Sequence, residues 1–223
     1  MFRFAPRALA ALVATLLLAT PALAKIADKD FAQAKKDLEQ ALASSDADAT
    51  IKALGEVAAD GTRRAAEVLV EAGISDKLGS PKVYDAILGA LRGLEGEGRA
   101  ALVDWVEHRT EPRQWATRCV LCDALSAVEG AEVTRALAGR LKDPVAYVVS
   151  AAARALGKRK DKGGVDALVH ALGELEKKKD ATWLDVRAAL TAICGYDFET
   201  ASEWSAFWAS KKDSFDPEKD RGQ

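Results

Sequence analysis

Apolar residues recur along most of the chain at the three- and four-residue spacing of an amphipathic α-helix. The stripe within residues 28–44 is a clear example and comprises Phe31, Ala34, Leu38, Ala41 and Leu42. This spacing places apolar side chains on one face of a helix, whereas a half-buried strand would require strict alternation. Comparable stripes predict helices at residues 46–59, 62–72, 81–94, 97–109, 112–128, 131–142, 144–156, 164–178 and 181–194. We therefore predict an all-α protein.

One segment, DPVAYVVSAAARALG at residues 143–157, shows the predicted helix signals most completely. Asp143 can accept hydrogen bonds from the first free backbone N–H groups, and Pro144 suits the first helical position, where no N–H is needed. Gly157 is expected to end the helix. The alanines between these ends are small enough to let a neighbouring helix approach closely. The segment therefore predicts a helix that is packed on both flanks.

Weaker copies of this segment recur through the chain. They end near Leu54, Leu91, Leu125, Leu156 and Cys194. The intervals are 37, 34, 31 and 38 residues, and each holds two predicted helices, the second of which opens with Pro81, Pro112 or Pro144 in three units. Helical pairs repeated at such a period are typical of α-solenoids, whose units bury their apolar faces by stacking. We expect about five helical hairpins across residues 25–195.

The repeat resembles the HEAT-repeat family, in particular the short bacterial HEAT-like repeats of the bilin-lyase-like type. The residues that carry the resemblance are DPVAYVVSAAARALG at 143–157, TRCVLCDALS at 117–126 and VRAALTAICG at 186–195. Arg118 and Arg187 match the arginine of the family pattern, whereas Val149 replaces it in the fourth unit. The resemblance implies a right-handed superhelix that binds proteins or peptides along its concave face.

Residues 1–24 have the three regions of a secretory signal peptide. Two arginines precede a 12-residue apolar run, and the sequence TPALA follows it. We expect cleavage after Ala24 and export to the periplasm or the medium. The apolar run is shorter than the roughly 20 residues needed to span a bilayer, so we expect no stable membrane span after cleavage.

The chain after Gly195 is expected to cover the exposed apolar end of the last repeat unit. Trp204, Phe207 and Trp208 lie on one face of a predicted helix within residues 196–212. Terminal capping elements of this kind are required in repeat arrays. The alternative for these rings is an aromatic box for a ligand. Residues 213–223 are polar, and we expect a disordered tail.

The charge balance and the cysteines limit the chemistry of the predicted domain. Removing residues 1–24 takes away two arginines and leaves 30 basic against 34 acidic residues, which argues against a nucleic-acid partner. Cys119 and Cys122 form a C-x-x-C in mid-helix, and Cys194 makes the count odd. They are interpreted as buried thiols, with one disulfide or a metal site as alternatives.

Aromatic and basic residues recur at the starts of the predicted second helices. Each ring follows an acidic residue, Glu111, Asp143 or Asp180, and the set comprises Trp115, Arg118, Tyr147, Arg154, Trp183 and Arg187. Stacked units would place these side chains next to one another. Two interpretations remain open: a ladder of acid–arginine pairs between units, or a partner-binding groove in which Trp, Tyr and Arg supply most of the binding energy.

The sequence contains no nucleophile elbow, phosphate-binding glycine loop or paired-histidine zinc motif. We therefore expect a non-catalytic scaffold without a cofactor, which acts as a monomer and binds an as yet unidentified protein or peptide. The alternatives are a cofactor-handling or lyase-like enzyme, as the bilin-lyase-like resemblance implies, and a structural envelope protein that assembles with itself.

Overall fold

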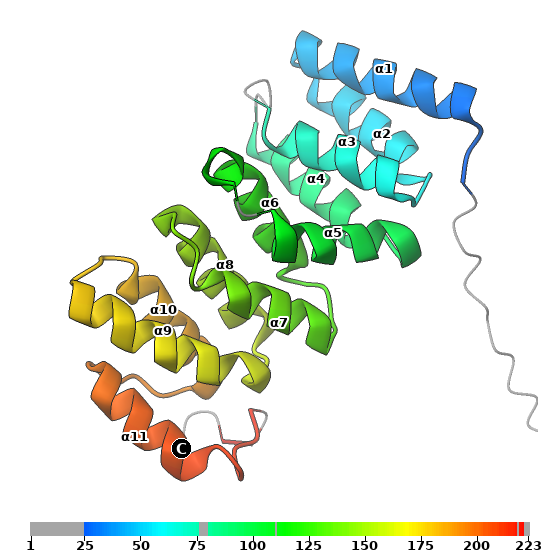
Figure 1. Ribbon diagram of the computed structural model, residues 1–223. Helices are drawn as coiled ribbons and strands as arrows, with labels where there is room; N and C mark the ends of the chain where they lie inside the picture. The colour runs from blue at the N-terminus through cyan, green and yellow to red at the C-terminus, as the bar shows by residue number, and fades with distance from the viewer. Residues whose placement is uncertain (1–24, 76–79, 110, 218, 221–223) are drawn as a thin grey trace, which may run out of the picture.

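The computed structural model describes residues 25–75, 80–109, 111–217 and 219–220 (Figure 1). In this part of the chain there are α-helices and two short 3₁₀ turns but no β-strand, which confirms the all-α prediction. The helices are α1 (Asp28–Ser44), α2 (Ala47–Ala58), α3 (Arg63–Gly73), α4 (Pro81–Arg92), α5 (Gly96–His108), α6 (Trp115–Leu125), α7 (Ala131–Arg140), α8 (Ala146–Arg159), α9 (Val165–Lys178), α10 (Trp183–Cys194) and α11 (Ala201–Lys211). The 3₁₀ turns are η1 (Pro112–Gln114) and η2 (Lys162–Gly164).

Consecutive helices form packed pairs, from α1 with α2 to α9 with α10. The even-numbered helices also pack one on the next, from α2 through α4, α6 and α8 to α10, and α5 packs between α3 and α7. Figure 1 shows the pairs following one another from α1 at one end to α11 at the other. Helices that are close in sequence therefore supply most of the packing contacts.

The residues that end the repeated segments all lie in the core. Leu54, Leu91, Leu125, Leu156 and Cys194 are buried between neighbouring helices. Burial of such side chains stabilises the fold by about 1.5–3 kcal/mol each. The sequence repeat therefore corresponds to a repeated packing position on the even-numbered helices.

Gly157 does not end α8, contrary to the sequence prediction. The helix continues to Arg159 and ends where Lys160 adopts a left-handed conformation at φ 54°. Gly157 instead lies against α10, where an added Cβ would come within 2.9 Å of the Cα of Ala189. The glycine is therefore needed for the close approach of two helices.

Two of the three prolines predicted to open helices precede them instead. Pro112 begins η1 and α6 starts at Trp115, while α8 starts two residues after Pro144, at Ala146. Each proline therefore belongs to the turn that leads into the helix. Pro81 is the first residue of α4, as predicted.

The buried carboxylate of Asp60 links the segment before α1 to the start of α3. Asp60 accepts hydrogen bonds from the backbone N–H of Ile26 at 3.2 Å and from Arg64 Nε at 3.1 Å, and also from the hydroxyl of Thr62. Arg64 in turn donates to the Ile26 carbonyl at 2.7 Å. Burial alone would raise the pKa of Asp60, but the hydrogen bonds from Arg64 and Thr62 lower it below its ordinary value of 3.8.

Replacing Asp60 with asparagine is expected to lower the free energy of unfolding by about 2 kcal/mol at neutral pH, because hydrogen bonds to a charged group are lost. A carboxylate with a lowered pKa stabilises the folded state above the ordinary value of 3.8, and this contribution disappears as the pH falls further. Urea unfolding should therefore show a constant difference from wild type down to about pH 5, then a shrinking one. Asp30→Asn, at an exposed carboxylate of α1, is the control. A difference that grows in acid would contradict this account.

α11 packs against α9 and closes one end of the helical array. Trp208 Nε1 donates to Asp166 Oδ1 at 2.9 Å, and the buried ring of Phe215 contacts Trp208 with centroids 5.7 Å apart. Phe215 lies in the tail predicted to be disordered, yet its side chain is buried against Trp208 of α11. The predicted signal peptide, residues 1–24, lies outside the described residues. None of the helices in the described ranges combines the length and apolar composition needed to cross a membrane.

Candidate binding surface

Three helices that pack side by side, α6, α8 and α10, carry all six predicted partner-binding residues near their starts or middles. The structure brings two of the rings together: the centroids of Trp115 and Tyr147 are 5.5 Å apart, with 33° between the ring planes. Trp115 is 43% exposed and Tyr147 is 69% exposed. Two large rings therefore contact each other and remain open to solvent.

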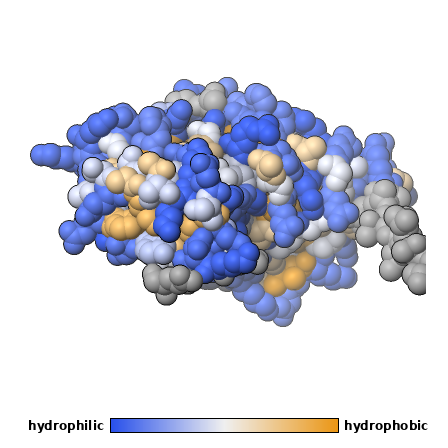
Figure 2. All heavy atoms as spheres, turned by 90° about the horizontal axis from the view of Figure 1, so that it is seen from below, coloured by the Kyte–Doolittle hydropathy of each residue, from blue (hydrophilic) through white to orange (hydrophobic). Residues whose placement is uncertain are grey.

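Leu184 is an exposed apolar side chain at the start of the next even-numbered helix, α10. It is the second residue of its helix, as Tyr147 is of α8, and it is 55% exposed. Trp183, which was predicted to take this role, is partly buried instead, with the guanidinium of Arg187 5.8 Å from its ring centroid. We call Trp115, Tyr147 and Leu184 together the apolar edge. Seen from the α11 end, Figure 2 shows a largely hydrophilic surface on which apolar residues gather in small patches.

Arg118 does not belong to this surface, because its side chain is 0% exposed. Its Nε and one terminal nitrogen donate to the two oxygens of Asp143 at 2.8 and 2.9 Å, and the other terminal nitrogen donates to the Glu111 carbonyl at 2.5 Å. The prediction that Arg118 binds a partner is therefore wrong. The Arg118–Asp143 pair, which joins α6 to the turn before α8, is the kind of contact that the alternative interpretation, a ladder of acid–arginine pairs, expects.

The other two predicted arginines differ from Arg118 in exposure and in contacts. The guanidinium of Arg187 donates two hydrogen bonds to the carboxylate of Asp197, both at 2.9 Å, and so links α10 to the segment before α11. Arg154 is exposed on α8. Its charge acts on Tyr84, whose hydroxyl donates to Asp123 Oδ2 at 3.1 Å. Arg154 is thus the one predicted arginine whose side chain is open to a partner.

Tyr84 and Asp123 extend the polar part of this face onto α4 and α6, and the sequence pattern did not single them out. Burial, together with the negative charge of Asp123, raises the pKa of Tyr84 well above its usual range. The phenol therefore stays protonated and keeps donating its hydrogen bond at physiological pH. The position of Tyr84 in the sequence could have identified it: it lies seven residues before Leu91, as Arg118 lies seven residues before Leu125.

The three cysteines are free thiols, and two of them, Cys122 and Cys194, are fully buried. Burial raises the pKa of Cys119 to about 11 and that of Cys194 to about 12. In all three, burial favours the protonated thiol over the thiolate, which is the reactive form. Cys122 and Cys194 are buried, as the buried-thiol interpretation expects, Cys119 is half-buried, and the structure joins none of the three in a disulfide. Among the described residues, no group of three or more His, Cys, Asp and Glu side chains is placed to hold a metal ion.

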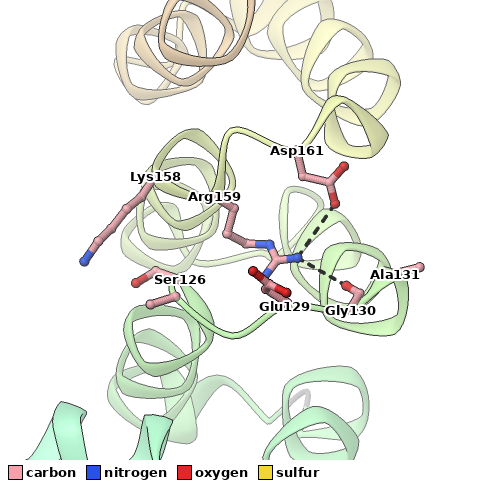
Figure 3. Close-up of a pocket in the computed structure, with 8 residues that line it drawn as sticks. Ser126, Glu129, Gly130, Ala131, Lys158, Arg159 and Asp161 are labelled. Atoms are coloured by element: carbon pink, nitrogen blue, oxygen red, sulfur yellow. Dashed lines mark hydrogen bonds and ion pairs between the residues drawn. The ribbon is translucent and has the colours of Figure 1, made fainter. Parts of the chain in front are cut away.

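A shallow cavity of about 480 Å³ lies between the α6–α7 loop and the end of α8 (Figure 3). Arg159 crosses it and donates to the Gly130 carbonyl at 3.2 Å and to the Thr134 hydroxyl at 3.0 Å. Burial alone would raise the pKa of Asp161, but hydrogen bonds from Thr134 and Gly163 lower it, so this partner of Arg159 is anionic. These contacts join the end of α8 to the start of α7.

Neither a scan against models of protein families nor a search of curated proteins finds a match to this chain. The HEAT resemblance of residues 117–126, 143–157 and 186–195 therefore stays a prediction. What the structure adds is geometric: helical pairs, a buried Arg118–Asp143 pair between units and the exposed apolar edge.

Proposed function

We propose that this chain is an exported, non-catalytic HEAT-like solenoid that binds an extended protein segment or peptide along its even-numbered helices. The HEAT resemblance implies that these helices line the concave face. The observation that carries the proposal is the apolar edge, in which Trp115 and Tyr147 contact each other at 5.5 Å while both remain exposed. Contiguous exposed apolar groups are typical of binding sites, and Trp and Tyr are among the residues that most often dominate binding energy.

The spacing of the apolar edge favours an extended ligand. Its three side chains come from the starts of α6, α8 and α10, which pack one on the next. Packed helices lie about 8–10 Å apart. An extended chain covers this distance in about three residues, at about 3.3 Å per residue. A peptide that crosses the helices could therefore place successive side chains against successive members of the edge.

Two further features support binding in preference to catalysis. Arg154, exposed on α8 about two helical turns after Tyr147, offers a cation for acidic groups of a partner. The side chains with the strongest intrinsic nucleophilicity, the three thiols, are kept protonated by burial. The signal-peptide prediction locates the proposed binding event in the periplasm or outside the cell.

The proposal predicts that a photo-cross-linking amino acid placed at Tyr147 captures a defined partner in intact cells that make the full-length protein. The same cross-linker at Ile74, which is exposed and apolar but lies after α3, is the matched control. The variant Trp115→Ala, with the cross-linker still at Tyr147, should reduce capture by about tenfold, as expected for loss of a residue that contributes at least 1.4 kcal/mol.

The thermal midpoint of the Trp115→Ala variant should stay within about 3 °C of wild type, because an exposed side chain contributes little to stability. Equal capture from positions 74 and 147, or capture unaffected by Trp115→Ala, would contradict the proposed surface. Capture of a second copy of the chain alone would instead indicate self-assembly.

A further inference from the structure

A second cavity, of about 700 Å³, lies between the α7–α8 turn and α9. Its floor is apolar and consists of the buried side chains Leu141, Val149, Ala171 and Leu175. Ionisable residues surround the floor: Lys142, Asp143, His170, Glu174, Lys178 and Asp180. A volume of this size lies within the range typical of ligand-binding pockets. The cavity adjoins the apolar edge but shares none of its residues.

The cavity lies where the fourth helical pair meets the fifth. The preceding junction, between the third and fourth pairs, shows which side chains can fill such a place. There Arg118 reaches from α6 into the turn before α8 and donates to both oxygens of Asp143. Val149 occupies the equivalent position on α8, seven residues before Leu156, as Arg118 is seven before Leu125. Asp180 stands in the turn before α10, as Asp143 does before α8. The junction between the fourth and fifth helical pairs therefore retains a carboxylate, that of Asp180, but has the short apolar side chain of Val149 in place of an arginine.

The carboxylate of Asp180 is held in position by its own turn. Its Oδ1 accepts hydrogen bonds from the backbone N–H of Thr182 at 3.0 Å and from the Thr182 hydroxyl at 2.8 Å. These hydrogen bonds lower the pKa of Asp180, which is therefore anionic at neutral pH.

The other charges around the cavity do not replace the missing arginine. Asp143 is fully buried and already pairs with Arg118 and Arg140. Glu174 pairs with Lys177 at 3.0 Å. The remaining basic side chains, Lys142, His170 and Lys178, are exposed. The charge of Lys178 helps to lower the pKa of Asp180, but no hydrogen bond or ion pair joins these two side chains in the described part of the chain.

We propose that this cavity binds the guanidinium group of an arginine supplied by the partner, which would donate to Asp180 as Arg118 donates to Asp143. The apolar floor would cover the methylene stem, an arrangement that suits arginine because its stem is apolar and its head is a planar donor. The inference rests on the proposed function, since the arginine would belong to the segment bound along the apolar edge, and it names one residue type that this segment must contain.

A small probe tests the cavity without the partner. N-acetyl-arginine amide, titrated into the ¹⁵N-labelled protein, should shift backbone amide signals of residues 149, 171–175 and 180 in a saturable way. N-acetyl-citrulline amide has the same shape without the charge and should bind about tenfold more weakly, while Asp180→Asn should remove the difference between the two probes. Equal shifts from both probes, or shifts confined to other residues, would overturn the proposal. Because the probe does not contact Tyr147, its failure is distinguishable from failure of the cross-linking experiment.

A second variant supplies the guanidinium from within the chain. Val149→Arg should abolish the response to N-acetyl-arginine amide and raise the thermal midpoint by about 2–4 °C, as a gained charge-assisted pair would. Val149→Met, with a long uncharged side chain, is the matched control and should retain a response to the probe. Adding Asp180→Asn to Val149→Arg should remove the gain. A Val149→Arg protein that is less stable than Val149→Met would show that the cavity does not accept a cation.

Discussion

Replacing Arg118 with methionine is expected to lower the free energy of unfolding by about 3 kcal/mol, the lower end of the range for breaking a fully buried ion pair. Methionine keeps most of the apolar stem but leaves the buried carboxylate of Asp143 without its two strongest donors, at 2.8 and 2.9 Å. The loss is limited because Asp143 retains Arg140 Nη1 at 3.3 Å and the backbone N–H of Val145 at 3.0 Å. Urea unfolding followed by circular dichroism measures the effect.

Two comparisons separate the buried pair from a general effect of losing an arginine. Arg154→Met removes an exposed arginine from the neighbouring helix α8 and should change stability by less than about 0.5 kcal/mol. The double variant Arg118→Met, Asp143→Asn should lose less unfolding free energy than the two single variants added together. The second change removes the buried negative charge that the first change leaves without its arginine. A single variant Arg118→Met as stable as wild type would mean that Arg140 and the Val145 N–H together satisfy Asp143.

The helical class of the fold could be predicted from the sequence because each helix buries a stripe at helical spacing. The predicted boundaries failed where a local signal had another cause. A glycine is needed at position 157 because α10 packs so closely on α8 that an added side chain would clash with the Cα of Ala189 in α10. The sequence pattern of α8 alone does not indicate this close approach. Phe215, a single ring in a polar tail, is buried because α11 brings Trp208 next to it.

The candidate site was predictable in residue type but not in exposure. Arg118 and Arg187 occupy matching places in the repeat, yet one is fully buried and the other is about a quarter exposed. The difference arises from the part of the chain that covers each helix. α6 is covered by another complete helical pair, so its arginine reaches into a closed junction. α10 is succeeded by the segment that leads to α11, and its arginine pairs there with the exposed Asp197.

Replacing Trp204 with alanine is expected to lower the free energy of unfolding by about 3–5 kcal/mol, the usual cost of removing a fully buried large aromatic side chain. Trp204 is 0% exposed, packs edge-on against Phe198 with ring centroids 5.0 Å apart and donates from Nε1 to the Phe198 carbonyl at 3.2 Å. Alanine leaves a cavity and an unpaired carbonyl at the junction between α11 and the segment before it. Trp115→Ala, the same change at an exposed position, should cost less than about 1 kcal/mol.

Hydrogen exchange shows whether α11 acts as the cap of the array. Terminal caps keep the apolar face of the last unit away from water, so loss of the cap should destabilise that unit too. In Trp204→Ala, amide protection should therefore fall in α9 and α10 as well as in α11, and the protein should bind a dye specific for exposed apolar surface. If only α11 loses protection while α9 and α10 exchange as in wild type, then the last helical pair is stable without its cover and α11 is an appendage.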